Sequence, residues 1–419
     1  MKRRDFLTST ALFSLFAGEA WAQTKPAAKP STAKPAAKKP AAKPNTRNTR
    51  TVKPTSSSKP KGPVARTAAD SVIERPPEGT SASRLPPVRP PEPPTEWRTF
   101  EITTTVTLPP NLKQPRLWLP LPMNQDALYQ RTLGHAWSGN SDNASMSRLP
   151  DGTLEVFFAE WDNSKPARLE LTTKVTTADR HFDVTKRTVA PEREDILRRY
   201  LQGSQLVPND GTAHALGERI VGRIKDPVAQ AKAIYDWVID NTVYDPTLPG
   251  AGNGDVRRQI NERQYGGRSA DINGLFVSLC RGIGIPARCV YGLRVAPSRL
   301  VRSLGLTGND ATRGQHVRAE FYIPGYGWIA VDPSDVRRAI AMEGLAERDS
   351  KLFMLRKVLF GVWEMNWIAY NTGTDISLPG QGPGQRQPFL LLPKLEAQGE
   401  KPQTFPYTIS ARQIDNDFF

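Results

Sequence analysis

Three residues whose side chains suit acyl transfer occur along the chain in the order Ser269, His316 and Asp332. A serine hydroxyl acts as a nucleophile when an imidazole takes its proton and an acidic side chain orients that imidazole. His316 and Asp332 belong to two alternating apolar segments joined by a Pro/Gly turn, which predict a β-hairpin. If the turn is centred on Pro324, His316 lies opposite Asp332 on one face of the sheet.

Ser269 begins a segment predicted to form a helix that ends near Gly284 and Pro286. The N-terminus of a helix offers free N–H groups and a partial positive charge, which stabilise a thiolate or a developing oxyanion. The same position suits a serine that only caps the helix, and Asp271 just behind it favours the helix dipole. The spacing alone favours the capping role, so a chemical role depends on the surrounding segments.

Those segments resemble the core of the bacterial transglutaminase-like superfamily. That family usually shows Cys-x-Asp-x-x-x-Leu-Phe, and this chain has Ser269-Ala-Asp-Ile-Asn-Gly-Leu-Phe276 in its place. The resemblance implies that Ser269 replaces the nucleophilic cysteine, and that His316 and Asp332 match the other two members of the triad. It covers most of residues 96–419, through segments 231–246, 285–288, 315–334, 363–371 and 378–380.

The resemblance implies an α+β fold, in which a papain-like core packs a helix on an antiparallel sheet after a small β-sandwich domain. The residue pattern agrees, since segments rich in β-branched residues with regular turn signals predict sandwich strands at 98–108, 116–120, 154–161 and 168–175. We therefore expect a sandwich domain at 96–188 and a transglutaminase-like core at 189–340. Residues 341–419 form a C-terminal extension, predicted to be helical over 340–370 and extended over 377–415.

The first 95 residues do not predict a folded domain. Residues 1–22 combine a twin-arginine motif, a short apolar run and an Ala-x-Ala cleavage site, so we expect a twin-arginine signal peptide and a periplasmic protein. The run is too short and wrongly flanked for a transmembrane anchor. Residues 23–95 repeat Lys, Pro and Ala and then Ser, Thr and Pro, which is typical of a disordered tether.

The charge of the chain is concentrated in that tether. It holds fifteen Lys and Arg against four Asp and Glu, or +11 of the formal +15. A basic tail beside a nearly neutral domain is unlike a nucleic-acid-binding domain, whose positive charge clusters on the folded surface. We expect the tether to contact anionic envelope material such as peptidoglycan or lipid headgroups, the alternative being a soluble spacer that binds nothing.

No pattern in the chain predicts a metal or cofactor site. The four histidines are scattered, no Cys or His pair has ligand spacing, and no cofactor motif occurs. Cys280 lies about three turns into the predicted helix, too far from its start to replace a thiol at position 269. We expect Cys280 and Cys289 to be buried free thiols, with a disulfide as the alternative.

Two functions follow from serine at the nucleophile position. A thiol ionises near pH 8.5, whereas a hydroxyl must lose its proton during attack, so a site shaped for cysteine works poorly with serine. We expect a catalytically impaired relative that binds a peptide, a protein or a peptidoglycan stem peptide in the former active-site cleft. The alternative is a serine-dependent amide hydrolase or acyltransferase that uses Ser269, His316 and Asp332. Its oxyanion donors would be the Ser269 N–H and a side chain from Gln264 or Tyr265, with the loop 250–254 as a mobile rim.

Overall fold

The computed structural model describes residues 94–110, 112–124, 128–162, 166–182, 189–382, 384–399 and 404–414. The predicted signal peptide (1–22) and residues 23–93 of the predicted tether lie outside these described residues. Everything described belongs to one compact unit that begins at Thr80. Within the described part, no helix has both the length and the apolar composition needed to cross a membrane.

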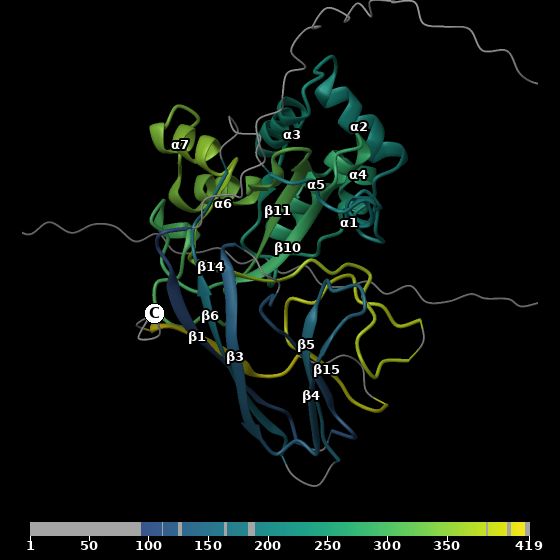
Figure 1. Cartoon of the computed structure of the whole chain (residues 1–419), viewed down its shortest axis with the longest axis vertical. Helices are drawn as coiled ribbons and strands as arrows, with labels where there is room; N and C mark the ends of the chain where they lie inside the picture. Colours follow the sequence, from purple (N-terminus) through teal and green to yellow (C-terminus); the bar gives the residue numbers. More distant parts are fainter. Residues whose placement is uncertain are drawn as a thin grey trace, which may run out of the picture. The chain divides into compact units, whose positions relative to one another are not determined.

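Six strands from the N-terminal part of the described chain and two from its C-terminal part form two four-stranded antiparallel sheets, ordered β16-β1-β6-β3 and β15-β2-β5-β4 (Figure 1). Side chains that alternate inward from both sheets build a shared core, which includes Leu117, Phe157 and Leu171. The strands are β1 (Arg98–Thr107), β2 (Arg116–Pro120), β3 (Gln130–Gly139), β4 (Asn143–Arg148), β5 (Glu155–Glu160), β6 (Arg168–Thr177), β15 (Lys394–Glu396) and β16 (Tyr407–Ile414). The four strands predicted from sequence are present as β1, β2, β5 and β6.

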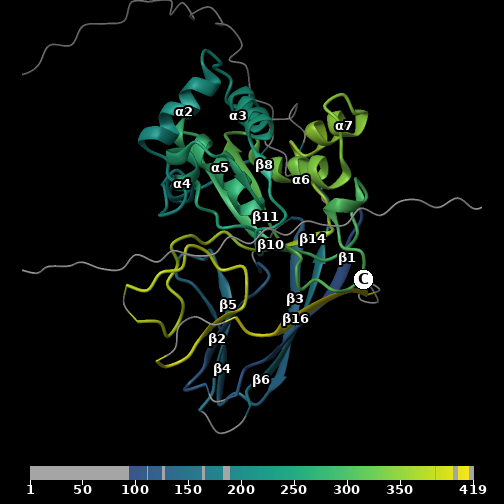
Figure 2. The same ribbon diagram turned by 180° about the vertical axis from the view of Figure 1, so that it is seen from behind.

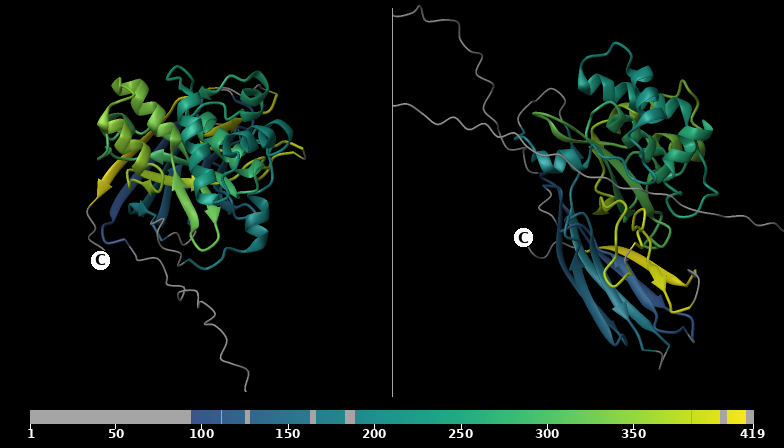
Figure 3. Two further views of the ribbon diagram at one scale, coloured as in Figure 1. Left: turned by 90° about the horizontal axis from the view of Figure 1, so that it is seen from above. Right: turned by 90° about the vertical axis from the view of Figure 1, so that its right-hand side faces the viewer.

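Each of these sheets takes its edge strand from the C-terminus of the chain. Strand β16 pairs with β1, with Ile102 opposite Ala411, and β15 pairs with β2, with Leu117 opposite Leu395. The yellow C-terminal strand lies beside the blue N-terminal strands in Figure 3. The last strands of the chain therefore complete the sandwich.

The part of the chain that follows the sandwich forms a core of helices and strands built on the antiparallel sheet β12-β11-β10-β14. Helix α5 (Ser269–Gly282) packs on one face of β10 (Ala287–Arg294) and β11 (Gln315–Ile323) (Figure 2). It is buried from Ser269 to Arg281, because apolar residues on most of its surface face either the sheet or the surrounding helices. The other helices are α1 (Glu194–Arg199), α2 (Gly211–Val221), α3 (Pro227–Asn241), α4 (Val256–Glu262), α6 (Pro333–Glu343) and α7 (Ser350–Val358), with a 3₁₀ turn η1 (Arg302–Leu304).

The hairpin of β11 and β12 (Gly327–Val331) forms as predicted, but its register differs. Ala319 faces Val331 and Ile323 faces Gly327, so the turn is centred on Gly325 instead of Pro324. His316 is therefore not directly opposite Asp332, which lies beyond the end of β12 as the N-cap of α6. The even spacing still keeps both side chains on one face, so they meet diagonally.

The prediction of a helix over 340–370 is wrong for its last part. After α7 the chain forms β13 (Val362–Trp363) and β14 (Trp367–Asn371), which pair with β7 (Arg180–His181) and β10. The apolar side chains of β14 have little helical periodicity and are buried against the sheet and the sandwich. Two further short strands, β8 (Val243–Tyr244) and β9 (Gly266–Gly267), pair in parallel, and β9 directly precedes α5.

The sandwich and the core share buried side chains. Phe100, Ile102 and Val175 of the sandwich pack with Leu293 and Ile368 of the core sheet in one apolar cluster. Both predicted free thiols are confirmed, since Cys280 in α5 and Cys289 in β10 are buried and unbonded.

Candidate active site

Ser269 is the first helical residue of α5, and the cap position before it is Arg268, whose backbone is extended. The side chain of Ser269 is 4% exposed, and its Oγ accepts a hydrogen bond from the backbone N–H of Val317 at 3.1 Å. The interpretation of Ser269 as the N-cap of its helix is therefore wrong. Its hydroxyl instead joins the start of α5 to strand β11.

The carboxylate of Asp271 organises the backbone around Ser269. Its oxygens accept the N–H groups of Asn253 at 3.1 Å, Gly254 at 2.8 Å and Arg268 at 2.8 Å. Burial raises the pKa of Asp271, although these three hydrogen bonds act in the opposite direction. The loop that was predicted to be a mobile rim is thus tied to the helix start. Asp271 therefore holds the loop, β9 and the start of α5 together.

Glycine is needed where two chain segments pass this carboxylate. Gly252 and Gly267 have φ values of +99° and +126°, and a Cβ atom on either would collide with the carboxyl group of Asp271. Glycine at both positions therefore allows the loop and β9 to approach the start of α5 closely.

His316 and Asp332 form the expected pair. The His316 Nε2 atom lies 2.7 Å from Asp332 Oδ2, and both side chains are buried. An ionised carboxylate can only accept a hydrogen bond, so this contact puts a proton on Nε2 and leaves Nδ1 as the acceptor of the neutral ring. That tautomer is the one a general base requires.

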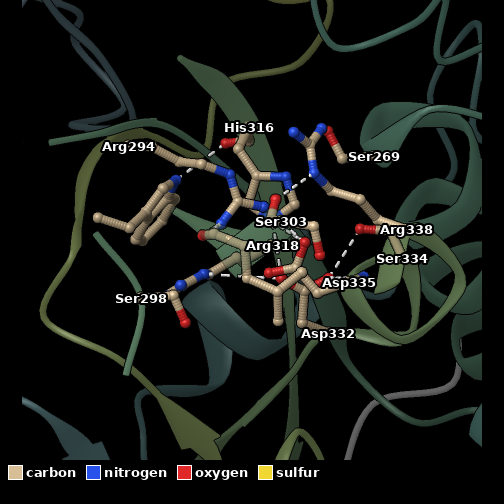
Figure 4. Close-up of polar contacts among 12 residues, drawn as sticks. Ser269, Arg294, Ser298, Ser303, His316, Arg318, Asp332, Ser334, Asp335 and Arg338 are labelled. Atoms are coloured by element: carbon tan, nitrogen blue, oxygen red, sulfur yellow. Dashed lines mark hydrogen bonds and ion pairs between the residues drawn. The ribbon is translucent and has the colours of Figure 1, made fainter. Parts of the chain in front are cut away.

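A network of buried charges surrounds this pair (Figure 4). Arg294 donates to Asp335 at 2.5 Å, and Asp335 lies 3.5 Å from His316 Nε2, while Arg318 lies 3.6 Å from Asp332. Burial lowers the pKa of His316 well below its usual 6.5, and the positive charge of Arg294 lowers it further. The imidazole is therefore neutral at pH 7.

Asp332 also has a structural role. Its Oδ1 accepts from the Asn273 side chain at 3.0 Å, from the Ser334 hydroxyl at 2.7 Å and from the Asp335 N–H at 3.1 Å. The last contact caps helix α6. Asp332 thus links α5, β12 and α6, whatever the chemistry at Ser269.

Ser269 and His316 do not form a nucleophile–base contact. Among the described residues, the only hydrogen bond of the Ser269 hydroxyl is the one from Val317, and neither imidazole nitrogen bonds to it. The three triad positions are brought together, but the link from base to nucleophile is missing. In this arrangement Asp332 orients the imidazole, and no hydrogen bond joins the imidazole to the Ser269 hydroxyl.

A pocket of about 800 Å³ lies beside the start of α5. It reaches Gly267 and Asp271, which are two residues either side of Ser269 in the sequence, and both Gln264 and Tyr265 line it. The two side chains proposed as oxyanion donors therefore face a space that can hold a ligand.

One set of possible metal ligands occurs in the described part of the chain. Single donor atoms of His316, Asp332 and Asp335 lie within 4.8 Å of one another. The carboxylates already accept hydrogen bonds from Arg294, Asn273 and other donors, so these groups are arranged as a proton and charge network. The donor set fits hydrogen bonding better than it fits metal coordination.

Several residues of the site were not predicted from the sequence. Asp335 follows Asp332 at the spacing of a helix-capping pair, so the motif Asp-Pro-Ser-Asp carries a local signal for it. Arg294 and Asn273 carry none, because their roles depend on contacts with residues about 40 and 60 positions away.

Comparison with known proteins agrees with this architecture. The profile of the transglutaminase-like superfamily matches residues 214–333, which include all three triad positions. An uncharacterized protein of Haemophilus influenzae is 31% identical over 282 residues, covering 63% of this chain and 76% of the relative. The chain belongs to the transglutaminase-like superfamily.

One solved structure shares the fold at lower identity. A candidate cysteine protease from Cytophaga hutchinsonii superposes with a TM-score of 0.52 at 17% identity, covering 78% of this chain and 93% of that one. The periplasmic domain of TgpA from Pseudomonas aeruginosa gives a TM-score of 0.30 at 19% identity, over 56% of this chain and 89% of that domain. The α+β class and the papain-like core are thus confirmed.

Proposed function

We propose that this protein is an exported, catalytically impaired member of its superfamily that binds a peptide or cell-wall stem peptide beside Ser269. The observation that carries the proposal is the hydroxyl of Ser269, which accepts the Val317 N–H and has no hydrogen bond with His316. The 800 Å³ pocket beside the start of α5 can hold a ligand. Binding without turnover accounts for both features.

The chemistry of oxygen and sulfur supports impairment. A thiol needs only a modest fall in pKa to become a nucleophilic thiolate, but a hydroxyl needs a base in contact with it during attack. Sulfur is also larger, with longer bonds, so a thiol at position 269 reaches further than the hydroxyl does. A serine hydroxyl in a site built for cysteine therefore ionises less readily than a thiol and does not reach as far.

The pocket has features suited to a peptide that carries an amine. Asp245, Asp255 and Glu262 line it, and the guanidinium of Arg258, which also lines it, is paired with Glu262 at 3.0 Å. Hydrogen bonds from Thr247 lower the pKa of Asp245, so this half-buried carboxylate stays ionised at neutral pH. A peptide containing lysine or another diamino acid would match this negative charge.

A second function is favoured by the state of His316. Its 2.7 Å contact with Asp332 and its lowered pKa leave a neutral, oriented imidazole, which is the form that activates a serine in Ser/His/Asp enzymes. If a bound substrate turns the Ser269 hydroxyl toward Nδ1, the protein would act as a serine-dependent amide hydrolase or acyltransferase. Apo geometry is often looser than the geometry of the substrate complex.

Export and envelope contact complete the proposal. Residues 1–22 would direct the protein to the periplasm, and the basic tether 23–95 would contact anionic envelope material while the domains at 96–188, 189–340 and 341–419 remain free to bind. Deleting residues 23–95 tests the tether. Envelope association that is unchanged by the deletion would contradict this role.

Peptide binding is tested by filling the pocket. Gln264 is exposed and lines it, so Gln264→Trp should block the space without disturbing the core. We expect lysine-containing stem peptides to bind the native protein in calorimetric titrations, and the affinity to fall at least tenfold in Gln264→Trp. The matched control is Gln398→Trp, at an exposed glutamine outside the pocket, which should bind as the native protein does. Equal binding by both variants would contradict the assignment of the pocket.

A further inference from the structure

The site contains a second buried carboxylate that the triad does not account for. Asp335 is 1% exposed, and its Oδ1 atom lies 3.5 Å from Nε2 of His316, the nitrogen that also contacts Asp332 at 2.7 Å (Figure 4). A Ser/His/Asp triad uses one acidic side chain to orient its imidazole. The carboxylate of Asp335 therefore needs a separate explanation.

Helix capping does not explain the direction of this carboxylate. Asp335 is the third residue of α6, a position from which an acidic side chain can reach back to the backbone N–H of the cap residue. The equivalent Asp271 of α5 accepts that N–H at 2.8 Å. In α6 the same N–H, which belongs to Asp332, donates instead to the carbonyl of Leu359 at 2.9 Å. The carboxylate of Asp335 is directed toward His316 instead of the helix end.

Arg294 holds the carboxylate of Asp335 in this direction. The guanidinium is 3% exposed, donates to Asp335 Oδ1 at 2.5 Å and also donates to the backbone oxygen of Leu304. Because Arg294 belongs to β10, which is paired on both sides in the core sheet, its position is fixed by the fold. The ion pair thus fixes the position of Asp335 relative to the imidazole.

The charges that act on the imidazole come from three elements. In the described part of the chain they are the carboxylates of Asp332 and Asp335 and the guanidinium groups of Arg294 in β10, Arg318 in β11 and Arg338 in α6. Burial lowers the pKa of His316, the three guanidinium groups lower it further, and Asp335 acts to raise it. Asp335 therefore favours the charged form of the ring against three cations.

Two other side chains that face these carboxylates are neutral. Asn273 of α5 donates to Asp332 at 3.0 Å. Tyr235 of α3 is fully buried, and burial and the nearby carboxylates raise its pKa well above its usual range, so its hydroxyl stays protonated. Neither group can take the place of the charge of Asp335.

We propose that Asp335 is a positioning residue that stabilises the imidazolium form of His316 when a nucleophile at position 269 gives up its proton. The proton moves from the nucleophile to Nδ1, while the proton on Nε2 stays in its hydrogen bond with Asp332. The ring then carries one positive charge, which a carboxylate 3.5 Å from Nε2 stabilises. This inference rests on the acid–base role of His316 in the second proposed function, and it does not require a bound peptide.

Ionisation of a thiol at position 269 tests the role of Asp335 without a substrate. In Ser269→Cys the thiolate–imidazolium pair should form below the usual thiol pKa of about 8.5, as measured by the ultraviolet absorbance of the thiolate with the native protein as the blank. The native thiols do not interfere, because burial raises the pKa of Cys280 and raises that of Cys289 to about 12. Adding Asp335→Asn should raise the midpoint by at least about one pH unit. The matched control Asp349→Asn, at the N-cap of α7, should leave it unchanged.

A variant with the opposite effect separates electrostatics from a loss of structure. Adding Arg294→Gln to Ser269→Cys removes a cation that disfavours the imidazolium and keeps an amide donor for Asp335, so the midpoint should fall. A disrupted fold would instead move the midpoints of both double variants in the same direction, toward the usual thiol value. Near-ultraviolet circular dichroism checks that each variant keeps its tryptophan packing.

The outcomes distinguish this inference from the functions proposed above. An unchanged midpoint in either folded double variant, or a rise in both, would overturn the role of Asp335. A thiol in Ser269→Cys that does not ionise below about pH 8.5 would overturn that role and the acid–base role of His316 together. Failure of stem peptides to bind would contradict the proposed peptide site alone, because the ionisation measurement uses no peptide.

Discussion

Replacing Asp332 by alanine should destabilise the protein far more than loss of a helix cap can explain. The change leaves the Nε2–H of His316 without a partner, at about 2 kcal/mol, and removes the cap of α6, at about 1 kcal/mol. It also removes a carboxylate that offsets the buried Arg318, a class of change that costs about 3–5 kcal/mol. Because these contributions overlap, we expect a loss of about 4 kcal/mol in the free energy of unfolding.

Urea unfolding followed by tryptophan fluorescence measures this loss, provided that the slope with denaturant is unchanged. The matched control is Asp349→Ala, which removes the N-cap of α7 without a buried charge network and should cost about 1 kcal/mol. Asp332→Asn keeps the shape and the acceptor oxygen, so it should fall between the two. An Asp332→Ala variant that loses no more stability than Asp349→Ala would refute the structural role of this carboxylate.

Three further predictions follow from the site and the core. The pKa of His316 is lower in the folded protein than in the unfolded chain, so below pH 6.5 the unfolded chain binds a proton that the folded protein does not. The free energy of unfolding should therefore decrease as the pH falls below 6.5. Urea titrations of the native protein and of His316→Gln from pH 7 to pH 5 measure this effect. The difference in their free energies of unfolding should change by at most about 1.4 kcal/mol per pH unit, and the same pH dependence in both proteins would contradict the prediction. Gly267→Ala should cost at least about 2 kcal/mol more than Gly284→Ala in the same assay, since both glycines have positive φ but only the first would crowd a neighbouring carboxylate. Burial raises the pKa of Cys280 and raises that of Cys289 to about 12, so mass spectrometry should find neither alkylated by iodoacetamide at pH 8 until urea is added.

Local sequence signals were sufficient for the elements that carry the site. Asp226 and Pro227 indicate the start of α3, apolar alternation indicates β11 and β12, and the family resemblance aligns Ser269 with the start of α5. The polar and glycine-containing sequences of β3 and β4 lack such alternation, so neither strand was predicted. These strands exist because β5 and β6 offer edges to pair with.

The finer geometry of the site depends on contacts that no local pattern encodes. A shift of the turn from Pro324 to Gly325 changes which residue faces which across β11 and β12. The hydrogen bond from Val317 to Ser269 joins residues 48 positions apart. The sequence therefore predicts three site residues, but only the folded arrangement gives the direction of each side chain.

The most direct test of the central claim is acyl transfer by the native protein, Ser269→Cys and Ser269→Ala. Ammonia or amine release from glutamine-containing peptides and cell-wall stem peptides would be measured for all three at pH 7–8. An impaired site with an intact base predicts no turnover by the native protein or by Ser269→Ala, and measurable turnover by Ser269→Cys, whose thiol can ionise beside His316. Turnover by the native protein that is lost in Ser269→Ala would contradict impairment and establish a working serine triad.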